Sequence, residues 1–238
     1  MKHRVMAALL MVAALVPSIA TGAEPADRAS ALRASADHLD GTVGFVGETI
    51  VYASPGSGAE VSMPPQTGAA HARRDGGTGS VLGETITYRR VDSDDYASGN
   101  LRAGTAVADS RTQAVEISVM GTQIRARSVR AVSRATCDGP GTAATAAAGS
   151  HVTGLEIGGE ETAVSDVNQV AKVVEVGDHF IEVSALDVRR SASGEGWTTT
   201  GLLVRVRTVV PLPSPFKPSE VTTELRIGEA TTRLTCVG

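Results

Sequence analysis

Apolar and polar residues alternate along much of the chain from Gln113 onward. Three runs, residues 115–119, 202–207 and 221–227, place Val, Ile, Leu or Thr at every second position. Successive side chains of a β-strand point to opposite faces, so this pattern gives each strand one buried face and one wet face. Antiparallel strands packed in two sheets are the usual structure that such strands form.

Further strands are expected where apolar runs are bounded by Gly, Pro, Asp or Ser, at residues 122–137, 150–157, 171–176 and 179–189. The Gly177-Asp178 dipeptide between the last two runs predicts a hairpin turn. We therefore expect an all-β fold, an antiparallel β-sandwich-like domain with little helix. A β-roll or a solenoid would give the same alternation and stays an alternative.

The N-terminal part of the mature chain carries a different pattern. Within residues 24–44, Leu32, Ala36 and Leu39 have a spacing typical of a helix, and the segment is expected to be either a short helix or disordered. A single β-rich extracellular domain is expected over residues 45–238. Inside it, residues 63–80 are rich in Gly and Pro and predict a flexible loop.

The first residues have the three parts of a secretory signal peptide. Lys2 and Arg4 precede an uncharged apolar stretch at residues 5–16, which Pro17 and small residues follow. The apolar run is shorter than the ~17 residues that a membrane span needs. Cleavage is expected after Ala20 or Ala23, with Ala23 preferred, so that residues 1–23 are removed and no transmembrane segment remains.

Net charge and aromatic content exclude some functions. Removing Lys2 and Arg4 takes two positive charges and no acidic residue from a net charge of -4, which leaves -6. Nucleic-acid binding, which depends on clustered Lys and Arg, is therefore not expected. Aromatic residues make up only 3% of the chain, so rings for stacking sugars or single-stranded nucleic acid are scarce.

The two cysteines, Cys137 and Cys236, are the clearest paired feature. In an exported chain, two cysteines usually form a disulfide. They lie far apart in sequence, without a CxxC motif or a neighbouring histidine, so a metal site or a reactive thiol pair is the weaker interpretation. We expect a bridge that ties the end of the chain to its middle.

Candidate chemistry beyond the cysteines is sparse. The acidic run with Asp92, Asp94 and Asp95 offers oxygen ligands for Ca²⁺, but it lacks the glycine and the distal glutamate of an EF-hand loop, and a solvated turn is the simpler interpretation. The cluster at residues 71–75, HARRD, would allow contact with an anionic wall polymer, although two arginines in an exposed loop are ordinary. No metal and no cofactor are expected.

A catalytic site is not expected either. The chain has no G-x-S-x-G nucleophile motif, and its mature histidines stand singly in the sequence. A secreted hydrolase with a dispersed active site remains the alternative. It requires His151 or His179 to lie in a concave pocket with an acid and a serine.

Several short motifs follow one another in a recognisable order. They are AEVSMPP (residues 59–65), AVSRATC (131–137), SHVTGLEI (150–157), Asn168-Gln169, VSALDV (183–188) and Cys236. In this order, over roughly residues 45–238, the chain resembles the choice-of-anchor P family of actinobacterial exported β-rich proteins. Members differ in how, or whether, they attach to the cell. This chain shows no C-terminal sorting signal, which puts attachment in doubt.

The resemblance implies an extracellular β-rich domain and supplies no catalytic residues. We therefore expect a secreted or cell-envelope-associated, non-enzymatic domain with a structural or interaction role. Its ligand is unknown, and the partner classes in view are a cell-wall polymer or another envelope protein.

Overall fold

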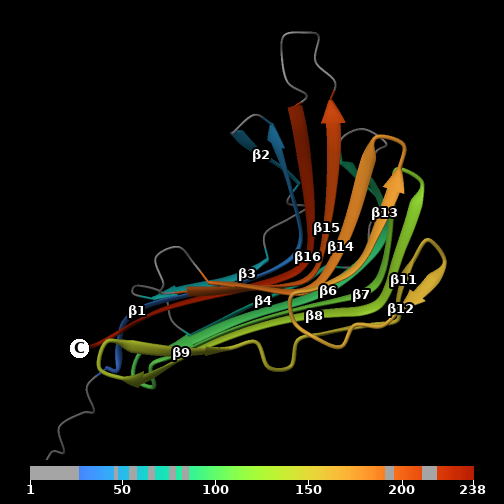
Figure 1. The fold of residues 1–238 in the computed structure, drawn as a ribbon. Helices are drawn as coiled ribbons and strands as arrows, with labels where there is room; N and C mark the ends of the chain where they lie inside the picture. Colours follow the sequence, from blue (N-terminus) through green and yellow to red (C-terminus); the bar gives the residue numbers. More distant parts are fainter. Residues whose placement is uncertain are drawn as a thin grey trace, which may run out of the picture.

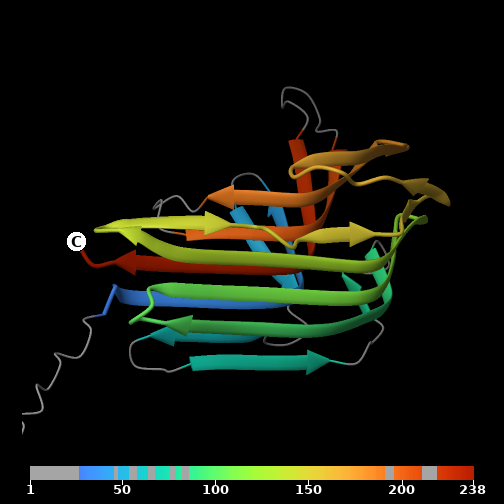
Figure 2. The same cartoon turned by 90° about the horizontal axis from the view of Figure 1, so that it is seen from below.

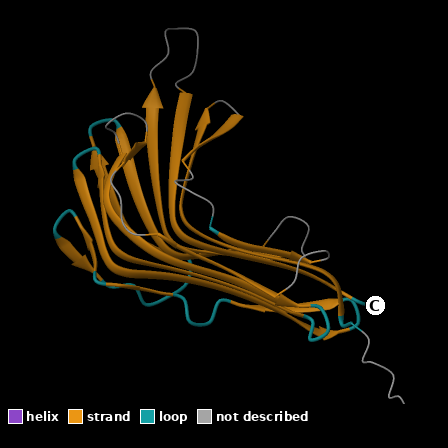
Figure 3. Ribbon diagram, turned by 180° about the vertical axis from the view of Figure 1, so that it is seen from behind, coloured by secondary structure: helices purple, strands orange, loops and turns teal. Residues whose placement is uncertain are grey.

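A computed structural model of the chain describes residues 27–45, 48–53, 58–63, 68–74, 79–81, 86–190, 196–210 and 219–238. The predicted signal peptide and a proline-rich segment at residues 211–218 lie outside the described residues. The described chain is built from strands and turns, as Figure 3 shows. All described strand pairs are antiparallel and form two sheets, which confirms the predicted all-β, sandwich-like fold.

Sheet A has seven strands. In spatial order they are β13 (Gln169–Val176), β14 (His179–Arg190), β15 (Gly196–Val210), β16 (Ser219–Cys236), β1 (Ala29–Phe45) and β2 (Glu48–Ala53), with β3 (Ala59–Met63) also paired to β1. The strand β13 forms one edge of this sheet. The predicted hairpin turn at Gly177-Asp178 is confirmed, because Val176 pairs with His179 across it.

Sheet B has nine strands. Its main path runs β12 (Glu160–Thr162), β11 (Leu155–Ile157), β8 (Thr122–Gly139), β7 (Thr105–Val119), β6 (Ile86–Asn100) and β4 (Gly68–Arg74), while β5 (Gly79–Val81) pairs with β6, and β9 (Thr142–Ala146) and β10 (His151–Thr153) pair with β8. Figure 2 shows the long strands lying side by side.

The long strands of both sheets bend at one line, so that the molecule has two arms (Figure 1). At this line the strand pairing skips one residue on each strand: Thr200 pairs with Glu229, and the next pair is Leu202 with Ile227. Three strands have a residue with positive φ there, Leu186 in β14 (53°), Gly228 in β16 (65°) and Ala114 in β7 (52°). An extra residue with left-handed backbone bends a strand, as in a β-bulge.

The bend also reverses which residues face the interior. In β16 the buried positions are Thr223, Leu225 and Ile227 before the bend, and Ala230, Thr232 and Leu234 after it. Because the side-chain period of a strand is two, a single extra residue moves every later side chain to the other face. The same change occurs in β7, where burial passes from Ser110 and Thr112 to Val115 and Ile117.

Each arm has its own hydrophobic core. We call one the valine arm, and its buried residues are Val115, Ile117, Val119, Ile124, Ala126, Val129, Val152, Leu155, Ile157, Ile181, Val183, Ala185, Leu186, Leu202, Val204, Val206, Leu225 and Ile227. We call the other the alanine arm, with Ala29, Leu32, Ala34, Ala36, Ala59, Val61, Ala97, Ala106, Ala108, Ala131, Ala135, Cys137, Ala230 and Leu234. Large aliphatic side chains thus fill one arm, and methyl groups fill most of the other.

The predicted disulfide is present at the far end of the alanine arm. Cys137 in β8 is bonded to Cys236 at the end of β16, with 5.7 Å between their Cα atoms. The bond joins sheet B to sheet A. The guanidinium of Arg28, next to the start of β1, donates a hydrogen bond to the carbonyl oxygen of Cys137. These contacts bring both ends of the described chain to one place.

The N-terminal segment differs from its prediction. Ala29–Phe45 is neither a helix nor disordered but forms β1, which pairs with β16 along almost its whole length. Ala36 and Leu39 lie opposite Ala230 and Ile227, two buried residues three positions apart on either side of the bend. Strand alternation with one added residue therefore imitates helical spacing, and the β-fold begins well before residue 45.

The predicted loop at residues 63–80 also differs from the structure. It contains Gly68–Arg74 as β4, at an edge of sheet B, and it ends inside β5, which is Gly79–Val81. Ala70 and Ala72 of β4 are partly buried against the core of the alanine arm. Alanine is a weak hydrophobic signal, so this alternation was not visible as a strand pattern.

Candidate functional site

A concave feature lies in the valine arm, between the edges of the two sheets. It is a cleft of about 770 Å³ bounded by β13 of sheet A and, from sheet B, by the start of β8 and the turn between β11 and β12. Its lining residues are Gly121, Thr122, Gln123, Arg125, Glu156, Gly158, Gly159, Glu160, Lys172, Val173, Val174 and Glu175. Glycines, valines, two uncharged polar side chains and charged side chains make this lining, so it has no ring on which a sugar would stack.

One wall of the cleft is the edge strand β13. Its inner face contributes Val174 and Val176, which are partly buried against the core of the valine arm. Its outer face carries Val170 and Val173, which are 51% and 49% exposed, and Val167 just before the strand is 57% exposed. Isolated exposed valines are ordinary, but three within seven residues form an apolar strip along a strand edge.

The backbone of β13 has unused hydrogen-bonding groups toward its open side. The pair that closes a two-residue hairpin is hydrogen-bonded, and such pairs alternate with non-hydrogen-bonded pairs along an antiparallel ladder. Val176 and His179 close the β13–β14 hairpin, so Val173 and Glu175 belong to the non-hydrogen-bonded pairs. Their N–H and C=O groups therefore point away from β14.

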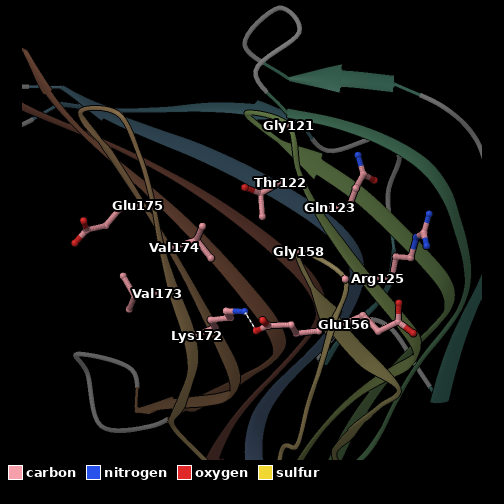
Figure 4. Close-up of a pocket in the computed structure, with 12 residues that line it drawn as sticks. Gly121, Thr122, Gln123, Arg125, Glu156, Gly158, Lys172, Val173, Val174 and Glu175 are labelled. Atoms are coloured by element: carbon pink, nitrogen blue, oxygen red, sulfur yellow. Dashed lines mark hydrogen bonds and ion pairs between the residues drawn. The ribbon is translucent and has the colours of Figure 1, made fainter.

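Lys172 crosses the cleft from β13 to the opposite sheet (Figure 4). Its ammonium group donates a hydrogen bond to the carboxylate of Glu160 in β12 and approaches the carbonyl oxygen of Ile157 at 3.4 Å. The hydrogen bond and the charge of Lys172 both lower the pKa of Glu160. The Glu160 side chain is 76% exposed, so this ion pair holds the two sheet edges together only weakly.

The charges of the lining do not balance. Lys172 is engaged by Glu160, and Arg125 lies directly opposite Glu116 and Glu156 in the strand register, where opposite charges attract. Glu175 adds a further exposed carboxylate on β13. The lining is therefore slightly acidic.

The structure separates the candidate Ca²⁺ ligands. Asp92, Asp94 and Asp95 all lie within β6, in the middle of a strand. Asp94 is exposed and contacts His71 of β4, whereas Asp95 is buried and accepts a hydrogen bond from Ser110 Oγ at 2.6 Å. Adjacent strand residues point to opposite faces, so these two carboxylates do not share a site. Nowhere in the described chain do three or more His, Cys, Asp or Glu side chains gather to hold a metal ion.

The two histidines of the hydrolase alternative have other neighbours. His151 in β10 is exposed, and its Nδ1 lies 3.1 Å from the carbonyl oxygen of Gly149. His179 at the start of β14 has its Nδ1 2.7 Å from Thr208 Oγ1. Across the residues that the structure describes, neither histidine has both an acid and a serine within hydrogen-bond distance.

Sequence reasoning did not find the cleft. The residue that could have indicated it is Lys172, which points inward within a run of valines. An inward lysine is typical of a free sheet edge, where it limits pairing with other strands. The two turns that shape the cleft, at Gly121 and Gly158-Gly159, were visible only as glycines. The spatial meeting of β13 with β11 and β12 depends on the pairing of both sheets.

Comparison of the chain with protein-family models, with curated proteins and with solved structures finds no match. None of the described residues forms a helix with the length and hydropathy needed to cross a bilayer. The chain is an all-β sandwich with one disulfide, and that bond is typical of an oxidising, extracytoplasmic compartment.

Proposed function

We propose that this protein is a secreted or cell-envelope-associated, non-enzymatic β-sandwich domain that acts through interaction with another macromolecule. The disulfide between Cys137 and Cys236 is the observation that carries the proposal, because such bonds persist in oxidising compartments and rarely in the cytosol. The predicted signal peptide at residues 1–23 is consistent with the same route.

The interaction role is supported by the kind of concave surface that the fold offers. The cleft combines a free strand edge, exposed valines and charged side chains, which are features of macromolecular recognition. The positions of His151 and His179 provide no support for the hydrolase alternative. Membership of the choice-of-anchor P family, suggested by the order of short motifs, is part of this proposal and would make the source an actinobacterium.

Fractionation of cells tests the location. The full chain is expressed in an actinobacterial host, and supernatant, wall, membrane and cytoplasm are probed for the protein. We expect it in the supernatant or the envelope, with residues 1–20 or 1–23 removed and both thiols resistant to alkylation unless a reductant is added. A matched chain lacking residues 1–23 should stay in the cytoplasm with reduced thiols. Recovery of the full chain only from cytoplasm, with its first residues intact, would overturn the proposal.

A further inference from the structure

The edges of the two sheets leave a gap in the sandwich at the cleft. At this end, sheet A stops at β13 and sheet B stops at β12, a strand of only three residues. Lys172 bridges the gap with an exposed ion pair and a weak contact to a backbone carbonyl. The chain thus provides eight residues of edge strand, Gln169–Val176, beside a cleft that a further strand would fill.

We propose that the cleft binds an extended polypeptide of another protein, which adds a strand to the free edge of β13 and carries basic side chains. The inference rests on the proposed interaction function and specifies its partner. The outward N–H and C=O groups of Val173 and Glu175 provide the backbone hydrogen bonds. Apolar side chains on the inner face of the added strand contact Val174 and Val176.

Charge complementarity selects the partner. After Lys172 and Arg125 are offset by their neighbours, the exposed carboxylate of Glu175 remains at the cleft. A basic peptide gains a favourable contact with this carboxylate, whereas an acidic peptide is repelled. A second copy of this chain would bring another Glu175 and a second acidic molecule to the same edge, so it is the poorer occupant.

The edge itself limits what can bind. A register shift interrupts β13 between Val170 and Lys172, and the lysine points inward. Bulges and inward charges are the usual means by which a free edge avoids indiscriminate pairing. An added strand must therefore displace the Lys172 ammonium group from Glu160 or supply a new partner for it, which gives the site a means of selection.

Peptide selection on the purified, disulfide-bonded protein tests the proposal. The probe is a phage-displayed library of random linear peptides, and the enriched sequences are synthesised for binding measurements. We expect enriched peptides to alternate apolar residues with others that include Arg or Lys. If no peptide is enriched over a selection on the Val173→Pro protein, the proposal is overturned.

Two variants at one position separate backbone pairing from side-chain contact. Val173→Pro removes an outward N–H without removing a β13–β14 hydrogen bond, so the protein should keep its melting temperature within a few degrees. It should bind a selected peptide at least about tenfold more weakly, which corresponds to the loss of one hydrogen bond. The matched Val173→Ala protein keeps the N–H and should bind within about threefold of wild type. Equal binding by wild type and a folded Val173→Pro protein would contradict strand addition.

Three further results complete the test. Glu175→Lys should weaken binding of the basic peptides, while Glu60→Lys, an exposed substitution on β3, should not.

In the wild-type protein the peptide should slow hydrogen exchange at the amides of Val173 and Glu175, a readout that needs no variant, and unchanged exchange there would count against the proposal. A concentration-dependent dimer in sedimentation that Val173→Pro abolishes would assign the edge to a second copy and overturn the proposal. Cell fractionation is scored separately, so location and peptide binding fail independently.

Discussion

The two arms of the sandwich share the long strands of both sheets but have different interiors. In the valine arm, sixteen of eighteen buried core residues are Val, Ile or Leu, whereas in the alanine arm ten of fourteen are Ala. Burying a Val, Leu or Ile side chain contributes about 1.5 to 3 kcal/mol, and burying a single methyl group contributes about 0.8 kcal/mol. The same backbone therefore gains much less hydrophobic stabilisation in the alanine arm.

The difference explains where the covalent bond is placed. The disulfide joins the two sheets at the end of the alanine arm, where the hydrophobic contribution is small. The valine arm has no cysteine in its core and holds the cleft with its free strand edge. One arm is therefore stabilised by its large side chains and the other by its crosslink.

Removal of the disulfide should have the largest effect. A bond across a sequence separation of 99 residues is expected to contribute about 4 kcal/mol to the free energy of unfolding. Denaturant unfolding of the Cys137→Ala, Cys236→Ala protein should show this loss. Reduced wild-type protein is the control that keeps the native side chains, and a loss below about 1 kcal/mol in both would contradict the role given to the bond.

Truncation in the valine arm comes next. Leu202 is fully buried in β15, so Leu202→Ala should lower the free energy of unfolding by about 3 kcal/mol through lost burial and a cavity. The comparison variant Ala108→Gly removes one methyl group from the alanine arm and should cost about 1 kcal/mol. Equal losses in chemical denaturation would remove the energetic distinction between the arms.

The bend between the arms should be sensitive to one methyl group. A Cβ added to Gly201 would lie 2.3 Å from Val129 Cγ1 and 3.2 Å from the carbonyl oxygen of Ile227, so the sheets approach too closely for alanine there. Gly201→Ala should destabilise the protein by about 2 kcal/mol. The double variant with Val129→Ala should cost less than the two single losses added together, and strict additivity would show that the contact is unimportant.

Acid should affect the outer surfaces of both arms alike. Burial alone would raise the pKa of Asp109, but hydrogen bonds from Arg130 and Arg111 outweigh it and hold the pKa below its ordinary value. Burial would likewise raise the pKa of Glu224, but the hydrogen bonds and charges of Arg205 and Arg226 outweigh it and lower that pKa. Because both folded-state pKa values are lowered, the stabilisation is present above the ordinary carboxyl pKa and is lost as pH falls through the folded-state value.

Neutral substitutions measure this contribution. Asp109→Asn and Glu224→Gln should each cost about 1 kcal/mol at neutral pH and flatten the acid limb of the stability profile. The sizes should be similar, since these ion pairs lie on outer faces and depend little on the cores. An unchanged acid limb in both proteins would show that other groups govern acid unfolding.

The smallest effect is a gain. Ala114 has a φ of 52°, a conformation that is unfavourable for a residue with a Cβ. Ala114→Gly relieves this strain in the folded state but also makes the unfolded chain more flexible. Because the first effect is larger, the free energy of unfolding should rise by about 0.5 kcal/mol. Ala126→Gly, at a buried and regular strand position, is the control and should destabilise.

Sequence reasoning predicted what depends on local pattern. Alternation over residues 221–227 located β16, Gly177-Asp178 located a hairpin, and two cysteines indicated the disulfide. The pattern did not predict the features that depend on the bend. Gly228, which the strand pairing skips, changes which positions of β16 are buried. The buried Ala and Thr residues after it therefore do not continue the alternation of residues 221–227. In β1 the same skip imitated a helix.

The candidate site was hidden for a related reason. Acidic residues at 92–95 looked like a turn because Ser93 and Asp95 are polar, yet both are buried in β6 near the bend. The cleft needs the edges of two sheets to meet, and no local pattern reports that two distant edges face each other. Lys172 was visible as a residue, but its partner Glu160 was not.

Native-state hydrogen exchange, measured with and without a reductant, tests the central claim most directly. We predict that reduction accelerates exchange at amides of the alanine arm, such as Ala34, Ala108 and Ala230, well before it affects Ile117 and Leu202 of the valine arm. Equal acceleration in both arms, or earlier loss of protection in the valine arm, would contradict the account that the crosslink stabilises one arm and large side chains the other.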